Sequence, residues 1–137
     1  NIVCKLITKH VRALVNHSGT VLIVNGNAVD IDHTGYNPRT AIGQRADGTV
    51  ILVCTNGRTE EHLGATLPDV TGILQEYGAV NACALLGGSS ANMLYRDTQG
   101  LHGETGTVHM FNPKSAELNI FTGLALRRLP TFWMVKP

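Results

Sequence analysis

Short apolar segments separated by polar turns dominate the hydrophobic pattern of this chain. Residues 20–24 are apolar and β-branched, and they end at Asn25-Gly26, a dipeptide that favours the two-residue turn of a β-hairpin. Residues 28–31 are expected to form the returning strand. The spacing therefore predicts a first hairpin between residues 20 and 31.

A second hairpin is predicted around Asp47-Gly48. Residues 40–44 and 49–55 flank this turn dipeptide on either side. The second arm is apolar almost throughout, which is typical of an interior strand that is covered on both faces.

Residues 66–77 carry the pattern of one amphipathic helix. Thr66 suits the N-cap, Pro68 lies in the first turn, and Asp69 follows three residues after the cap. Gly78 is placed to end the helix in a left-handed conformation. Apolar residues recur on one face at helical spacing, namely Leu67, Val70, Ile73, Leu74 and Tyr77.

Further strands are expected before and after a glycine-rich break. Residues 82–86 form a buried apolar segment, and Gly87-Gly88-Ser89-Ser90 interrupts it. Other strands are predicted at 11–15, 91–95, 107–111 and 132–135. Together these elements predict a single α+β domain over residues 1–137, with a mainly antiparallel β-sheet and one well-capped helix packed on it.

Composition and charge narrow the classes of function. The chain has 137 residues, with 11 Lys+Arg against 10 Asp+Glu. Binding nucleic acid through phosphate contacts requires a basic surplus, so we expect no nucleic-acid partner. The charged fraction is 15%, against about 25% in typical soluble proteins. Such a neutral polar surface suits an extracellular or cell-surface protein, an assembly subunit, or a sugar-binding protein.

Several kinds of segment and site are not expected. The longest apolar stretches, 21–24 and 50–54, are too short to span a membrane, and the chain carries no targeting signal. Cys4, Cys54 and Cys83 lack CxxC spacing, and the six histidines lack ligand spacing, so we expect neither a metal nor a cofactor. One disulfide with one free thiol, and three reduced thiols, remain alternatives.

Three polar segments follow or precede the apolar strands, at residues 37–40, 55–58 and 87–90. Arginine carries a planar fork of donors that suits phosphate, and successive glycines let backbone N–H groups approach an anion. Arg39, Arg58 and the glycine-rich turn would then form a cradle for a phosphodiester. In the alternative interpretation the segments are ordinary turns and loops, and Arg39 pairs with an acid.

The order of these segments resembles the phosphodiester glycosidase family. The matching motifs are Asn-Pro-Arg-Thr-Ala-Ile-Gly at 37–43, Thr-Asn-Gly-Arg at 55–58, Ala-Leu-Leu-Gly-Gly-Ser-Ser at 84–90 and Arg-Arg-Leu-Pro-Thr-Phe at 127–132. The family includes an enzyme that uncovers mannose 6-phosphate by removing N-acetylglucosamine from a phosphodiester. The resemblance runs from about residue 20 to 136 and implies the C-terminal part of such a domain, truncated at its N-terminus.

The resemblance also implies a set of binding residues. The arginines are expected to hold phosphate, and the glycine backbone and serine hydroxyls to contact phosphate or sugar oxygens. The expected substrate-binding residues are Arg39, Thr40, Asn56, Gly57, Arg58, Gly87, Gly88, Ser89, Ser90 and Arg128.

Two aspartates of the family pattern are replaced in this chain, by Asn56 and Leu86. Glycoside hydrolysis generally uses one carboxylic acid and one carboxylate, so no catalytic residue is assigned. We expect a phosphodiester glycosidase-like domain that hydrolyses or binds a sugar phosphodiester. The alternative is a catalytically degenerate structural or carbohydrate-binding module, such as a subunit of an extracellular or phage-tail-like assembly, and it predicts a homo-oligomer.

Overall fold

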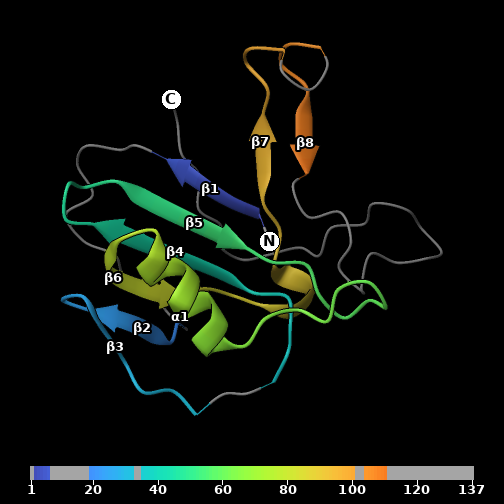
Figure 1. Ribbon diagram of the computed structural model, residues 1–137. Helices are drawn as coiled ribbons and strands as arrows, with labels where there is room; N and C mark the ends of the chain where they lie inside the picture. The colour runs from blue at the N-terminus through green and yellow to red at the C-terminus, as the bar shows by residue number, and fades with distance from the viewer. Residues whose placement is uncertain (1, 7–18, 33–34, 101–103, 111–137) are drawn as a thin grey trace.

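Six strands form one antiparallel sheet in the computed structural model, which describes residues 2–6, 19–32, 35–100 and 104–110 (Figure 1). The sheet order is β1-β5-β4-β6-β2-β3. The strands are β1 (Ile2–Leu6), β2 (Val21–Val24), β3 (Asn27–Ala28), β4 (Thr40–Arg45), β5 (Val50–Cys54) and β6 (Ala79–Ala84). The predicted α+β class with a mainly antiparallel sheet is confirmed, whereas the strands expected at 11–15 and 132–135 lie outside the described residues.

Both predicted hairpin turns are present. Asn25 and Gly26 have φ values of 49° and 81°, and Gly48 has a φ of 83°, as these turns require. The returning arm of the first hairpin is shorter than expected, because β3 ends at Ala28. Ile31 packs against the hydrophobic core instead of continuing the strand.

The second arm of the second hairpin, β5, is an interior strand as predicted. It pairs with β4 on one side and β1 on the other, and four of its five residues are buried. The pattern did not predict β1, which has no turn signal beside it. β6 begins at Ala79, three residues earlier than predicted, directly after the turn that ends the helix.

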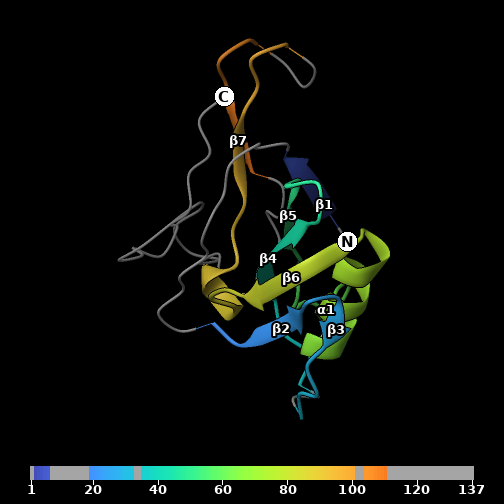
Figure 2. The same cartoon turned by 90° about the vertical axis from the view of Figure 1, so that its left-hand side faces the viewer.

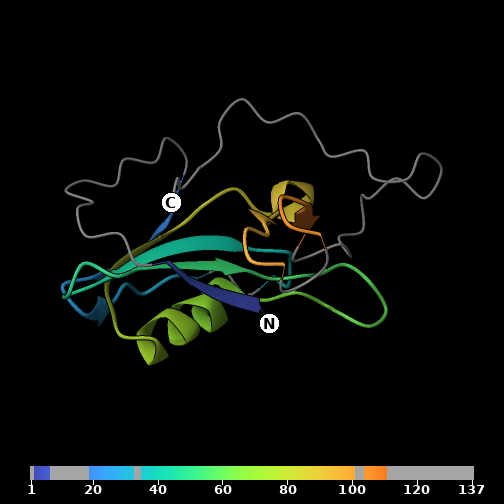
Figure 3. The same ribbon diagram turned by 90° about the horizontal axis from the view of Figure 1, so that it is seen from above.

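Helix α1 (Leu67–Glu76) covers one face of the six-stranded sheet (Figure 3). Its N-cap is Thr66, whose hydroxyl accepts a 3.1 Å hydrogen bond from Asp69 N, while Asp69 Oδ2 accepts one of 2.8 Å from Thr66 N. Gly78 adopts a φ of 79° beyond the last turn. The helix and sheet share a core whose largest members are Leu22, Ile23, Ile51, Val53, Leu67, Val70 and Leu74.

A second, two-stranded sheet follows a short 3-10 turn, η1 (Gly88–Ser90). It consists of β7 (Leu94–Arg96) and β8 (Val108–Met110), and it stands away from the larger sheet (Figure 2). The predicted 107–111 strand corresponds to β8, except that residue 111 lies outside the described residues. The predicted 91–95 strand begins only at Leu94, because residues 91–93, directly after the 3-10 turn, belong to no regular element.

Two further expectations concern cysteines and membranes. No disulfide joins Cys54 and Cys83, and burial raises the pKa of Cys54 to about 12. The alternative of one disulfide therefore does not involve a bond between these two residues. In the described part of the chain, α1 is neither long nor apolar enough to cross a membrane, and no other helix is either.

Candidate functional site

The three polar segments meet at one end of the sheet. β4 lies between β5 and β6 and runs antiparallel to both, so its first residues lie beside the last residues of its neighbours. Thr55 N donates a 2.8 Å hydrogen bond to Arg39 O, and Arg39 N donates one of 2.9 Å to Thr55 Oγ1. Gly88 N donates one of 2.8 Å to Pro38 O. These bonds join 37–40 to both 55–58 and 87–90.

The Arg39 side chain is held by main-chain oxygens. Its Nε donates a 3.1 Å hydrogen bond to Ala65 O, and its Nη2 donates one of 2.8 Å to Gly35 O. Burial, and secondarily the neighbouring charge of Arg58, lower the pKa of Arg39 from its ordinary value. Among the described residues no carboxylate forms an ion pair with Arg39, so the interpretation in which it pairs with an acid finds no support there.

Arg58 adopts a left-handed backbone conformation, with a φ of 59°. Residues other than glycine take this conformation at a cost of about 1–2 kcal/mol, and such residues cluster at functional sites. Its Nε and Nη2 donate hydrogen bonds of 3.0 and 2.7 Å to Asn37 Oδ1. A Cβ atom at Gly88 would lie 3.7 Å from both Nη atoms of Arg58, so the glycine borders the guanidinium directly.

Gly57 sits where two backbone segments cross. A Cβ atom there would lie 2.7 Å from Pro38 N and 2.8 Å from Gly64 Cα, closer than real Cβ atoms approach. Gly64 itself has a φ of 114° and packs equally tightly on Asn37. The glycine at 57 therefore serves close packing, which orients the Arg58 segment against residues 37–40.

Two amides of the glycine-rich turn form hydrogen bonds within the protein. The Gly88 N–H group is used by Pro38 O, and Ser90 N donates a 3.3 Å hydrogen bond to Gly87 O. A Cβ atom at Gly87 would lie 2.9 Å from Pro38 O. Gly87 thus permits a close approach to Pro38, whereas Gly88 has a φ of 63°. The side chain of Ser89 lies outside what the structure describes.

Thr40 and Leu86 are joined across the end of the sheet. The Thr40 hydroxyl donates a hydrogen bond to Leu86 O, and Leu85 N donates one of 2.8 Å to Thr40 O. The proton of this hydroxyl is therefore used inside the protein, so Thr40 can offer only acceptor oxygen to a ligand. Leu86 exposes 39% of its surface next to the glycine turn.

Asn56 is half-buried between Thr55 and Gly57. Its Oδ1 atom is buried and has no hydrogen-bond partner within the described part of the chain. A buried polar atom without a partner is uncommon in folded proteins and calls for a specific explanation. The unsatisfied atom is an acceptor, whereas the amide nitrogen of the same side chain is a donor.

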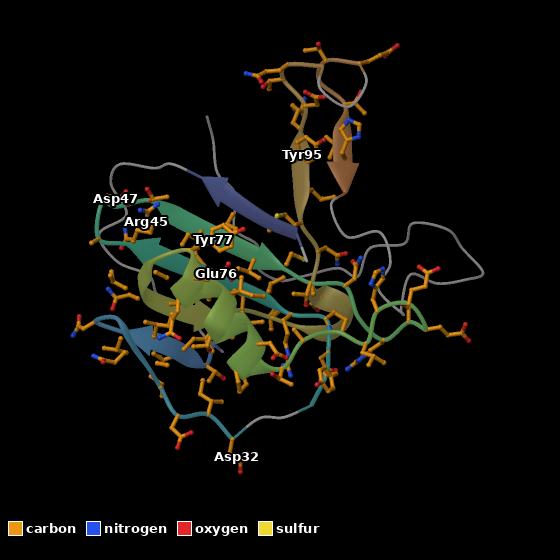
Figure 4. All side chains as sticks on the ribbon, in the orientation of Figure 1. Asp32, Arg45, Asp47, Glu76, Tyr77 and Tyr95 are labelled. Carbon is orange, nitrogen blue, oxygen red and sulfur yellow. The ribbon has the colours of Figure 1, made fainter. Side chains whose placement is uncertain are left out.

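Two of the acids whose bonds the structure describes lie in turns outside the three motif segments. Asp97 accepts hydrogen bonds from Gln99 N and Gly100 N at 2.9 and 2.8 Å. Asp47 forms a 3.9 Å ion pair with Arg45 at the opposite end of β4 (Figure 4). Asp32 lies on the outer bend of the loop that precedes the site (Figure 4).

Two further expectations concern Arg128 and metal binding. Arg128 lies outside the described residues, so its place relative to the other site residues is not established. Within the described ranges no group of three or more His, Cys, Asp or Glu side chains is arranged to hold a metal ion.

Comparison with known proteins identifies the family. The family model described as phosphodiester glycosidase matches residues 4–136. The chain belongs to the phosphodiester glycosidase family. The match begins at residue 4, well before residue 20, where the resemblance of the motifs starts.

Two relatives illustrate how this phosphodiester glycosidase domain relates to longer proteins. An SPbeta prophage-derived uncharacterized protein of Bacillus subtilis (strain 168) is 40% identical over 55 residues, which cover 40% of this chain and 8% of that protein. A hypothetical protein from Synechocystis of known crystal structure is 34% identical, with a TM-score of 0.44, over 53% of this chain and 15% of that one. The chain therefore matches only a small part of each relative's length.

One contributor to the site was not among the residues predicted to bind. Asn37 holds the Arg58 guanidinium, and its position directly before Pro38-Arg39 is the only signal that could have indicated it. Gly35 and Ala65 act through main-chain oxygens, which carry no signal in the sequence.

Proposed function

We propose that this phosphodiester glycosidase-like domain binds a sugar phosphodiester at the Arg39–Arg58 site, defined as Arg39, Asn56, Arg58 and Gly88. Arg39 and Arg58 would hold the phosphate oxygens, and the Asn56 amide would contact a ligand oxygen. Membership of the family supports a sugar-linked phosphate as the ligand.

The proposal rests on the surroundings of the Arg39 side chain, namely its hydrogen bonds and the nearby charge of Arg58. Its guanidinium donates to two carbonyl oxygens, which are neutral, and it lies close enough to Arg58 for the two charges to interact. Like charges repel, and burial of a charge costs free energy unless it is compensated. An anion between the two guanidinium groups would supply that compensation through charge-assisted hydrogen bonds.

We do not propose that this chain hydrolyses the bound phosphodiester. Asn56 and Leu86 stand where the family pattern has aspartates, and neither side chain can act as an acid or a carboxylate base. We accordingly expect binding without turnover by this chain, with no release of phosphate monoester from a sugar phosphodiester in phosphorus NMR.

Calorimetric titration with the methyl diester of N-acetylglucosamine 1-phosphate tests the proposal. The Arg58→Gln variant should weaken binding by about tenfold to a hundredfold, because a charged hydrogen bond contributes about 1.5–3 kcal/mol. Arg45→Gln is the matched control, since Arg45 lies at the end of β4 that is farther from the site.

Three outcomes of this titration are informative. Unchanged binding by Arg45→Gln, with weakened binding by Arg58→Gln, supports the site. Equal effects of the two substitutions, or no binding of the diester by the unmodified protein, would contradict it. Methyl N-acetylglucosaminide, which lacks the phosphate, should bind much more weakly than the diester.

We also propose an extracellular or cell-surface location for this binding function. The support is the low charged fraction of 15%, which leaves a polar but nearly neutral surface. Detection of the protein in the cell-surface or medium fraction, against a cytosolic marker, would test the location.

A further inference from the structure

Asn37 lies directly before the Pro38-Arg39 motif, and its side chain contacts the Arg58 guanidinium. We infer that Asn37 is a positioning residue, whose amide oxygen fixes the Arg58 guanidinium beside Arg39 before a ligand arrives. The inference rests on the proposed function, because it concerns the same site, and it adds a residue that need not touch the ligand.

The backbone of Asn37 is held by a neighbouring segment of the chain. Asn37 N donates a 3.2 Å hydrogen bond to Ala65 O, and Ala65 N donates one of 2.9 Å to Asn37 O. A Cβ atom at Gly64 would lie 2.5 Å from the carbonyl carbon and oxygen of Asn37, so this segment packs directly on the residue. The Asn37 side chain therefore extends from a backbone position that does not depend on a ligand.

The contact between Asn37 and Arg58 defines the direction of the guanidinium. Asn37 Oδ1 accepts hydrogen bonds of 3.0 Å from Arg58 Nε and 2.7 Å from Arg58 Nη2. Both donors lie on one edge of the planar guanidinium group, so one oxygen facing that edge restricts rotation of the side chain. The Arg58 backbone is also held, since its N–H group donates a 3.2 Å hydrogen bond to Leu63 O. Without the Asn37 amide, the long Arg58 side chain would regain part of its rotamer freedom.

Arg39 is held by the same part of the chain. Arg39 Nη2 donates a 2.8 Å hydrogen bond to Gly35 O, two residues before Asn37. Arg39 Nε donates one of 3.1 Å to Ala65 O, which also accepts a hydrogen bond from Asn37 N. The charge of Arg58 contributes, after burial, to lowering the pKa of Arg39, so the two guanidinium groups are close enough to repel each other. These hydrogen bonds therefore set the spacing of two like charges that would otherwise move apart.

The amide at position 37 also affects the charge of the site. An amide oxygen accepts both hydrogen bonds from Arg58 without adding a negative charge, whereas an aspartate would accept them and repel an anionic ligand. Position 37 can therefore be varied in two ways. One substitution removes the two hydrogen bonds, and the other keeps them and adds a charge.

The first test observes the Arg58 side chain without ligand, by proton–nitrogen NMR spectroscopy. In the unmodified protein the Arg58 Nε–H group should exchange slowly with water, because Asn37 Oδ1 accepts this hydrogen. Asn37→Ala should accelerate the exchange about tenfold, the factor that corresponds to the loss of a hydrogen bond to a charged group. The Arg39 Nε–H group should exchange as before, because its acceptor is the main-chain oxygen of Ala65. Unchanged exchange at Arg58 would overturn the inference.

Asn27→Ala is the matched control for this experiment. Asn27 is exposed in β3, and its side chain donates a 3.3 Å hydrogen bond to Asn25 O. The control should leave the exchange at Arg58 unchanged, and an acceleration equal to that of Asn37→Ala would overturn the inference. If Asn37→Ala does not fold, Asn37→Ser takes its place with the same expected result, because the serine side chain is too short to reach both Arg58 nitrogens.

The second test measures affinity by calorimetric titration with the methyl diester of N-acetylglucosamine 1-phosphate. Asn37→Ala should bind about threefold to tenfold more weakly, because the ligand must then order the Arg58 side chain. Undiminished affinity in this variant would overturn the inference. Asn37→Asp should keep the slow exchange of the Arg58 Nε–H group and still bind more weakly, because its charge opposes that of the phosphate. Undiminished affinity in Asn37→Asp would overturn the argument from charge.

The two tests separate the inference from the proposed function. The exchange of the Arg58 Nε–H group is measured without ligand, so it reports on positioning independently of binding. Fast exchange in the unmodified protein, with binding of the diester intact, would overturn the inference and leave the proposed function standing. Slow exchange without any binding of the diester would remove the proposed function, and with it the role of Asn37 in binding.

Discussion

Gly57 shows at the residue scale how the candidate site depends on close packing. Any side chain at this position meets backbone atoms of Pro38 and Gly64 within 2.8 Å. Backbone atoms cannot move aside to accommodate a new Cβ atom as the end of a flexible side chain can. Gly57→Ala should therefore lower the free energy of unfolding by about 1–3 kcal/mol, the usual cost of overpacking.

Gly72 offers a matched control for this substitution. It is exposed within α1, and a Cβ atom there would meet nothing within 4 Å. Gly72→Ala should raise the free energy of unfolding by about 1 kcal/mol, because alanine has the higher helix propensity. Urea unfolding of both variants measures the difference, and a Gly57→Ala protein as stable as the unmodified one would contradict the packing argument.

The hydrogen-bond partners of the predicted site residues could not be read from the sequence. The motifs indicated Thr40 and Gly88 as ligand contacts, yet the Thr40 hydroxyl proton and the Gly88 N–H group are used by Leu86 O and Pro38 O. Such use depends on the distance between chain segments that are far apart in sequence. A local sequence pattern shows which hydrogen-bonding groups are present, but it does not show which partner each group binds in the folded chain.

At the scale of elements, α1 depends on its capping box. Hydrogen bonds from the side chain and then the backbone of Thr66 lower the pKa of Asp69. A carboxyl group whose pKa is lower in the folded state contributes stability above its unfolded-state pKa. That contribution is lost as the pH falls through the folded-state pKa.

Asp69→Asn should therefore be less stable than the unmodified protein at pH 6, by up to about 1 kcal/mol. The difference should shrink below about pH 4, where the unfolded-state carboxyl group is protonated and the folded-state one begins to be. Thermal unfolding at pH 6, 4 and 3 measures it. A difference that is constant over this range would show that the carboxylate charge contributes nothing to the cap.

Elements with strong local signals were predicted well. The dipeptides Asn25-Gly26 and Asp47-Gly48 correctly predicted the positions of two turns. The N-cap signal at Thr66 predicted the start of the helix to within one residue. The start of β6 and the presence of β1 were missed. Both depend on pairing with distant strands, since Ala79 pairs with Arg45 and β1 pairs with β5.

At the scale of the whole molecule, the antiparallel order β5-β4-β6 is what brings the motif segments together. The sequence pattern predicted that each segment lies at the end of a strand. Thr40 pairs with Cys54 and Ala41 pairs with Ala84, so these strand ends lie side by side. That sheet order could not be read from hairpin signals alone, because β4 and β6 are separated by a whole hairpin arm and a helix.

The state of assembly distinguishes the two expectations for the molecule. A structural module predicts a stable oligomer, whereas a self-contained binding domain predicts a monomer. Light scattering over a dilution series measures the mass in solution. A stable oligomer would support the structural module, and a concentration-independent monomer would contradict it.

The measurement that tests the central claim most directly is a two-dimensional amide NMR titration with the methyl diester of N-acetylglucosamine 1-phosphate. We predict saturable changes in the amide chemical shifts of Arg39, Arg58 and Gly88. No change is expected at Gly26 or Gly48, which lie in turns outside the site. Shifts confined to those turns, or no shifts at millimolar ligand, would contradict it.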